Sequence, residues 1–155
     1  MFYPLEYEDL ILRNSMIYEI DPYLIAAIIF VESKYINNAE SPRGALGLMQ
    51  IMPNTAYWIA QEMGIDNFSE KDLLNPELNI MFGTWYLANL RKQFDDEVII
   101  LAAYNAGRGN VVRWLDERWD GKINTIDTLP FPETRNYIMQ VRLVYERYKK
   151  IYALD

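Results

Sequence analysis

The chain contains no cysteine and no histidine among its 155 residues. Without cysteine there can be no disulfide bond, no iron–sulfur cluster and no thiol nucleophile. The absence of histidine removes the most common metal ligand and the usual general base of Ser-His-Asp chemistry. A metal site built from carboxylates alone stays open, but no ladder of Asp and Asn with calcium-loop spacing is present. No metal or other cofactor is therefore expected, and any catalysis must rest on carboxylates, tyrosines, lysines or amides.

Positive charge is also scarce, and long apolar runs are missing. Lys and Arg number 15 against 22 Asp and Glu, which gives a net charge of −7, and no basic run occurs. This balance argues against a nucleic-acid partner and against an electrostatic membrane anchor. No apolar run reaches the length of a transmembrane helix, so insertion into a membrane is not expected. No export signal stands at the start, and Met1 is either a true start or follows a removed export segment.

Apolar residues recur at helical spacing through most of the chain, and no segment alternates as a strand does. Hydrophobic residues make up 51% of the chain, which is ample for one core. We therefore predict one all-α domain over residues 1–155, with 1–4 as a linker remnant. Glycines, asparagines and a proline mark Ile36–Pro53 as an ordered loop. The predicted helical segments are Leu5–Ile20, Asp21–Tyr35, Asn54–Met63, Ser69–Leu74, Asn75–Phe94, Asp96–Ala106, Asn110–Arg118 and Pro132–Tyr152.

The segment Asp21–Ser33 carries the most information about function. Asp21 is a good N-cap and Pro22 suits the first helical position, so a helix is predicted here. Apolar residues cover every side of this helix, which is typical of the middle of a domain. Glu32 ends the apolar run, and burial there would raise the pKa of its carboxyl group, as a general acid requires. The alternative is an ordinary glutamate at a helix end, which reaches solvent or pairs with an arginine.

Four short motifs stand on separate segments: E-S at Glu32–Ser33, G-A-L-G-L-M-Q-I-M-P at Gly44–Pro53, A-Y-N-A-G at Ala103–Gly107, and P-F-P-E-T-R-N-Y at Pro130–Tyr137. Each alone has an ordinary structural explanation, such as a turn, a core methionine or a helix cap. In order and spacing they resemble the catalytic domain of the soluble lytic transglycosylases (SLT), lysozyme-like enzymes that cleave peptidoglycan. The resemblance runs from about residue 5 to 145. It implies an all-α, lysozyme-like helical domain with a substrate cleft between helical lobes.

The resemblance also implies roles for individual residues. Glu32 matches the catalytic acid of the family, and Tyr104 matches the tyrosine that hydrogen-bonds it. Tyr137 is a weaker match with a structural role. Gly44 and Gly47 lack a Cβ, which would let a polysaccharide lie against the backbone. The positions that match substrate-binding residues are Ser33, Ser41, Gly47, Gln50, Met52, Asn105 and Glu133.

A lytic transglycosylase needs one carboxyl group, because the 6-hydroxyl of N-acetylmuramic acid is the nucleophile and a 1,6-anhydro ring forms. Glu32 would act first as acid and then as base. The first alternative is a hydrolytic muramidase on the same fold, which needs a second carboxylate, for which Asp66, Asp72 and Glu133 are the acidic candidates. The second is a non-catalytic glycan-binding module. Peptidoglycan glycan strands are the expected partner of a monomer, in an extracytoplasmic location or a membrane-anchored longer parent.

Overall fold

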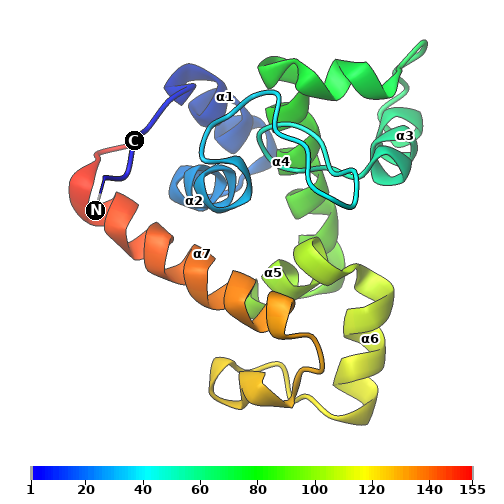
Figure 1. Ribbon diagram of the computed structural model, residues 1–155, viewed down its shortest axis with the longest axis vertical. Coiled ribbons are helices and arrows are strands. Elements are labelled where there is room, and N and C mark those ends of the chain that lie inside the picture. The colour runs from blue at the N-terminus through cyan, green and yellow to red at the C-terminus, as the bar shows by residue number, and fades with distance from the viewer. Residues whose placement is uncertain (1, 155) are drawn as a thin grey trace.

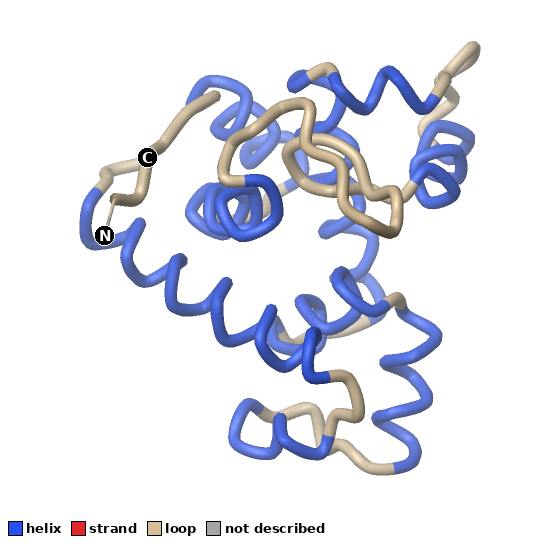
Figure 2. Tube along the Cα trace, viewed as in Figure 1, coloured by secondary structure: helices blue, strands red, loops and turns tan. Residues whose placement is uncertain are grey.

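The computed structural model describes residues 2–154, and Met1 and Asp155 lie outside the described part. Within it the protein is built from helices joined by loops, and its only β pairings are isolated bridges, from Leu46 to Glu40 and to Ile51 (Figure 2). The helices are α1 (Glu8–Tyr18), α2 (Pro22–Ser33), α3 (Pro53–Glu62), α4 (Pro76–Gln93), α5 (Glu97–Ala106), α6 (Arg108–Glu117) and α7 (Pro132–Ile151), with short 3-10 helices η1 (Glu70–Leu74) and η2 (Ile123–Thr128). The all-α prediction is confirmed.

Helix α2 forms the centre of the core. The Asp21 side chain accepts a hydrogen bond from the Tyr23 amide at 2.9 Å and caps the helix, and Pro22 occupies its first turn. Every residue from Leu24 to Ile29 is buried, as expected for a helix that is apolar on all sides. Figure 1 shows α7 running as one long helix alongside α2, and this pair makes the most extensive helix contact. The carboxyl end of α2 is thereby fixed beside the first turn of α7.

The other helices surround this pair. Helix α4 packs against α1 and α5, and α5 also contacts α7 and α6, so that α5 links the two sides of the molecule (Figure 1). Both ends of the chain lie together beside the end of α7. There the Tyr152 hydroxyl donates to the Tyr3 carbonyl at 2.6 Å, and the Tyr148 hydroxyl donates to the Pro4 carbonyl. Tyr3 and Pro4 thus contact the domain, while the role of residues 1–4 as a linker remnant stays a prediction.

Most predicted helix boundaries differ from the structure by one to three residues; helix α1, for example, begins at Glu8 and not at Leu5. Helix α6 begins at Arg108, two residues before the predicted start, because Gly107 adopts φ +91° and turns the chain directly out of α5 into α6. The segment after α6, predicted as a loop, contains the 3-10 helix η2. Its side chains supply local hydrogen bonds that the apolar pattern does not reveal, such as the one from the Thr128 hydroxyl to the Thr125 carbonyl.

Candidate active site

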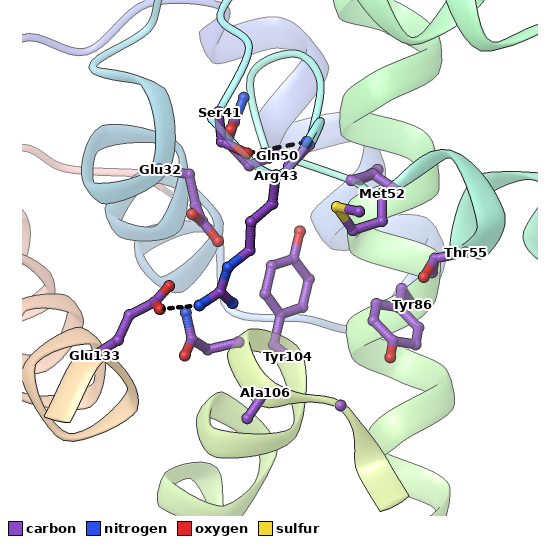
Figure 3. Close-up of a pocket in the computed structure, with 14 residues that line it drawn as sticks. Glu32, Ser41, Arg43, Gln50, Met52, Thr55, Tyr86, Tyr104, Ala106 and Glu133 are labelled. Atoms are coloured by element: carbon purple, nitrogen blue, oxygen red, sulfur yellow. Dashed lines mark hydrogen bonds and ion pairs between the residues drawn. The ribbon is translucent and has the colours of Figure 1, made fainter. Parts of the chain in front are cut away.

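A cleft of about 360 Å³ opens where α2, α3, α4, α5, α7 and the loop between α2 and α3 meet (Figure 3). It is open to solvent, which suits a chain-like ligand better than a small enclosed one. Seven of the nine residues predicted to form the site line this cleft, although they come from four separate stretches of sequence. They are Glu32, Ser41, Gln50, Met52, Tyr104, Asn105 and Glu133.

Glu32 lies at the base of the cleft, one residue before the end of α2. Helix α2 stops there because Lys34 takes a left-handed conformation with φ +51°. Burial raises the pKa of the Glu32 carboxyl from 4.5 to about 8. The nearby Tyr137 hydroxyl lowers this pKa and the Glu133 carboxylate raises it, but burial dominates. Glu32 is therefore a protonated acid at neutral pH that faces the cleft, as a general acid requires.

Two tyrosines flank Glu32, and the structure revises their expected roles. The Tyr104 hydroxyl donates to the Met49 carbonyl at 2.7 Å, not to Glu32 as predicted from the resemblance. The buried Tyr137 hydroxyl forms no hydrogen bond of ordinary geometry within residues 2–154, yet it lies close enough to Glu32 to lower the pKa of that carboxyl. Burial and the charge of Glu32 raise the pKa of both tyrosines well above 10, so both keep their protons.

The loop between α2 and α3 forms the roof of the cleft and is held by its own polar groups. The Ser41 hydroxyl accepts from the Ala45 amide at 3.0 Å, which closes a tight turn. The Gln50 side-chain amide donates to the carbonyls of Ala39 and Gly47 at 3.1 and 2.9 Å. Gln50 itself has φ +50°, an uncommon conformation for a residue with a side chain. Ser41 and Gln50, which were predicted to bind substrate, therefore also stabilise the conformation of the loop.

Asn79 of α4, which sequence analysis missed, anchors the same loop. Its side chain is fully buried, accepts from the Met49 amide at 2.7 Å and donates to the carbonyls of Leu46 and Leu73 at 3.0 and 2.9 Å. A buried amide is stable only when such partners satisfy it. The sequence signal was a lone asparagine among apolar residues of a helix, but its partner 30 residues earlier cannot be deduced from the sequence.

Two of the predicted substrate-binding residues lie outside the cleft. Ser33 is buried and its hydroxyl donates to the Ile29 carbonyl at 3.1 Å within α2. Gly47 is covered by Asn79 and by the Leu73 carbonyl, which would stand 2.2 and 2.3 Å from an added Cβ. The missing Cβ of Gly47 therefore makes room for α4 and η1, and a polysaccharide has no access to it. Gly44 has no atom within 4 Å of that position and remains open.

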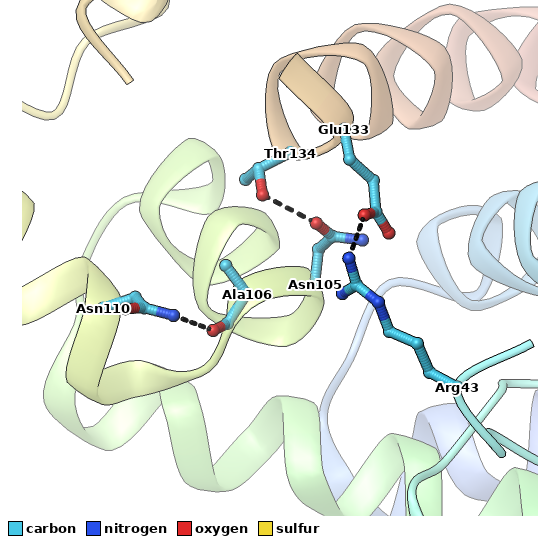
Figure 4. A network of polar contacts seen from close by, with 6 residues as sticks. All are labelled: Arg43, Asn105, Ala106, Asn110, Glu133 and Thr134. Atoms are coloured by element: carbon cyan, nitrogen blue, oxygen red, sulfur yellow. Dashed lines mark hydrogen bonds and ion pairs between the residues drawn. The ribbon is translucent and has the colours of Figure 1, made fainter. Parts of the chain in front are cut away.

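The other wall of the cleft is formed by α5 and the start of α7 (Figure 4). The Thr134 hydroxyl donates to the Asn105 side-chain oxygen at 2.8 Å, which leaves the Asn105 amide nitrogen directed toward Glu133. Glu133 makes an ion pair with Arg43 at 3.0 Å across the cleft mouth. Arg43 was not predicted as a site residue. Within residues 2–154 no three acidic side chains gather in a way that could hold a metal ion.

This geometry defines an all-α, lysozyme-like fold with a partly buried carboxyl group in an open cleft, and comparison with known proteins names the family. The chain belongs to the Transglycosylase SLT domain family, whose model matches residues 9–126. It is 39% identical over 158 residues to the soluble lytic murein transglycosylase of Escherichia coli K12, covering 99% of this chain and 24% of that protein.

Solved structures support the same family membership. The 70 kDa soluble lytic transglycosylase SLT70 of Escherichia coli matches with a TM-score of 0.85 and 39% identity, covering 96% of this chain and 25% of that chain. The inactive glutamate-to-glutamine mutant of lytic transglycosylase Slt from Pseudomonas aeruginosa matches with a TM-score of 0.84 and 35% identity, covering 96% and 25%. The chain thus spans about a quarter of the length of these relatives. No helix within residues 2–154 has the length and apolar character needed to cross a bilayer.

Proposed function

We propose that this domain is a peptidoglycan lytic transglycosylase, which cleaves the β-1,4 bond between N-acetylmuramic acid and N-acetylglucosamine and leaves a 1,6-anhydromuramic end. The observation that supports this most strongly is Glu32, a carboxyl group with a pKa of about 8 that faces an open cleft of about 360 Å³. Family membership and the whole-chain similarity to lytic murein transglycosylases support the same reaction.

The reaction needs one group that gives a proton and then takes one. Protonated Glu32 donates its proton to the glycosidic oxygen as the bond to N-acetylglucosamine breaks. The resulting Glu32 carboxylate then accepts the proton of the muramyl 6-hydroxyl as that oxygen attacks C1 and closes the anhydro ring. No water is consumed, and Glu32 ends protonated as it began. A pKa near 8 suits both steps, because the group is neither a strong acid nor a strong base at neutral pH.

The residues around Glu32 support this assignment without a second catalytic group. The Tyr137 hydroxyl lies close to the carboxyl group and lowers its pKa, which favours the ionised form and helps the proton leave. Tyr104 holds the loop above the cleft, where Gln50 and Met52 would contact the sugars. The inactive Pseudomonas relative carries glutamine in place of a glutamate, which agrees with an essential glutamate in the family.

Hydrolysis by a muramidase mechanism is the second candidate, and Glu133 is the observation in its favour. Of the three acidic residues considered as its second carboxylate, only Glu133 lines the cleft. Asp72 caps η1 by accepting from the Ser69 amide at 2.9 Å, and Asp66 lines a separate hollow beside α3. Glu133, however, is exposed and paired with Arg43, whereas a nucleophile or base needs a carboxylate held against the sugar.

Digestion of purified peptidoglycan, followed by mass spectrometry of the soluble muropeptides, tests the proposal. We expect 1,6-anhydromuramic ends from the wild type and nearly none from Glu32→Gln, while Glu62→Gln, an exposed glutamate at the end of α3, should keep full activity. Reducing muramic ends would replace the proposal with hydrolysis. Binding of strands without release of fragments, by wild type and Glu32→Gln alike, would favour a glycan-binding module.

The setting of the reaction follows from its substrate. Peptidoglycan lies outside the cytoplasm, so we infer an extracytoplasmic location for this domain. The curated relatives include soluble and membrane-bound lytic murein transglycosylases, and each is longer than this chain. Detection of the natural protein in cell fractions, with an antibody against this domain, would show whether it is free or membrane-anchored. Light scattering of the purified domain would test the expectation of a monomer.

A further inference from the structure

Arg43 occupies the boundary between two hollows on the same face of the protein. It lies at the tip of the turn that Ser41 and Ala45 close, and its side chain lines the catalytic cleft. It also lines a second hollow of about 290 Å³ between this loop, the start of α3 and η1. Met52 lines both hollows as well, so the two hollows are adjacent. A ligand in the cleft could therefore extend a branch past Arg43 into the second hollow.

The charges along this path are otherwise negative. Glu133 lines the cleft beside Glu32, which is protonated at neutral pH, and Glu40 and Glu70 line the second hollow. Within residues 2–154, Arg43 is the only cationic side chain that lines either one. An anionic ligand group that entered here would be repelled everywhere except beside Arg43. A guanidinium group also binds a carboxylate in a fixed, two-pronged geometry.

The partner that Arg43 has in the free protein is easily replaced. Its ion pair with Glu133 joins residues 90 positions apart at 3.0 Å, and the two side chains are 76% and 60% exposed. Exposed ion pairs of this kind contribute little to stability, because water solvates both charges well. Figure 4 shows the guanidinium group reaching over the cleft mouth toward the first turn of α7. An incoming carboxylate can take the place of Glu133 at little cost.

We propose that Arg43 binds a carboxylate of the peptide branch carried by the muramyl residue, and that this branch continues into the second hollow. This inference rests on the proposed function, since it assigns the substrate of the same cleft. The N-acetylglucosamine units of the strand are neutral, and the muramyl lactyl group is uncharged where a peptide is attached. The anionic groups of such a strand are therefore on its peptides, and Arg43 gives the domain a preference for peptide-bearing strands.

The test uses two substrates that differ only in charge. The amines of soluble peptidoglycan strands are first acetylated. Half of the sample is then treated with carbodiimide and ammonia, which converts the peptide carboxylates to amides. Binding is measured by calorimetry in a Glu32→Gln background, so that no cleavage occurs. In this background Arg43→Gln removes the charge, and Arg43→Lys keeps it. Arg13→Gln is the matched control, because Arg13 makes another exposed ion pair, with Glu77, away from the cleft.

We expect Arg43→Gln to weaken binding of the carboxylate strands roughly tenfold and to leave the amidated strands within about twofold of the parent. Arg43→Lys should retain part of the preference, because an ammonium group attracts a carboxylate without the forked geometry. Arg13→Gln should bind both strands as the parent does. Equal losses on both strands, or no loss on either, would overturn the role of Arg43. Failure of the parent to bind both strands would instead overturn the proposed function.

Discussion

The hydroxyl of Tyr104 donates a hydrogen bond to the backbone carbonyl oxygen of Met49 at 2.7 Å. This bond joins α5 to the loop that forms the roof of the cleft, across 55 residues of sequence. The same loop carries Gln50 and Met52, both of which line the cleft. Tyr104 thus helps to hold this loop in place on the side of the cleft opposite Glu32, where a sugar ring would have to fit.

The variant Tyr104→Phe should lower kcat roughly tenfold and leave the fold intact, because one neutral hydrogen bond to the loop is lost. Activity should fall without vanishing, since Glu32 keeps its burial and its proton. The measurement is the rate of anhydromuropeptide release, with Tyr145→Phe as control, because the Tyr145 hydroxyl donates to Asp21 instead. A loss as complete as that of Glu32→Gln would mean that Tyr104 takes part in proton transfer.

Tyr137 should affect the pH dependence of the reaction. Its hydroxyl lowers the pKa of Glu32, so Tyr137→Phe should raise that pKa further. Activity requires protonated Glu32 and falls as pH rises through its pKa, so the alkaline limb of the kcat/KM profile should move to higher pH. Tyr152→Phe, at the far end of α7, should leave this limb in place. An unchanged limb in Tyr137→Phe would show that the hydroxyl does not act on Glu32.

Glu32 should also make the stability of the protein depend on pH. Its pKa is raised from 4.5 to about 8 on folding, so the folded state binds the proton more tightly than the unfolded chain. The stabilising contribution is complete below pH 4.5 and is lost as pH rises to about 8. Glutamine resembles the protonated acid, so Glu32→Gln should be more stable than wild type at pH 8, by roughly 2–4 kcal/mol.

Thermal unfolding measured by circular dichroism checks this. The Tm of Glu32→Gln should exceed that of wild type by roughly 4–10 °C at pH 8 and should match it near pH 4. The exposed Glu62→Gln should show no such divergence. Equal Tm values for Glu32→Gln and wild type at pH 8 would mean that the Glu32 carboxyl is well solvated, and its role as a protonated acid would have to be abandoned.

The fold could be predicted largely from local patterns. Asp21, Pro22 and the apolar run after them fix the position of α2, and its cap forms as expected. The family resemblance carried by the four motifs also identified half of the residues that line the cleft. Their contacts could not be predicted, because these depend on residues far apart in sequence. Asn79 reaches Met49 over 30 residues and Arg43 reaches Glu133 over 90. No periodicity or cap signal encodes such a pairing.

Gly47 and Gly44 can be compared to test whether the loop glycines make room for neighbouring residues or for substrate. Both have positive φ, +81° and +95°, so alanine is strained at either position. At Gly47 the added Cβ would also stand 2.2 Å from the Asn79 side chain and 2.3 Å from the Leu73 carbonyl, whereas at Gly44 no atom lies within 4 Å. We expect Gly47→Ala to cost roughly 3 kcal/mol or more and Gly44→Ala roughly 1 kcal/mol.

Urea unfolding of the two variants beside wild type measures this difference. Two equal losses of stability would indicate that backbone strain alone matters and that the contact with Asn79 is not limiting.

Measuring the binding of glycan strands then separates the two roles that a missing Cβ can have. Gly44 is open beside the hollows, so Gly44→Ala should weaken binding of glycan strands while the domain stays folded. Gly47→Ala should weaken binding only as far as it unfolds or displaces the loop, because Asn79 and η1 keep substrate away from Gly47.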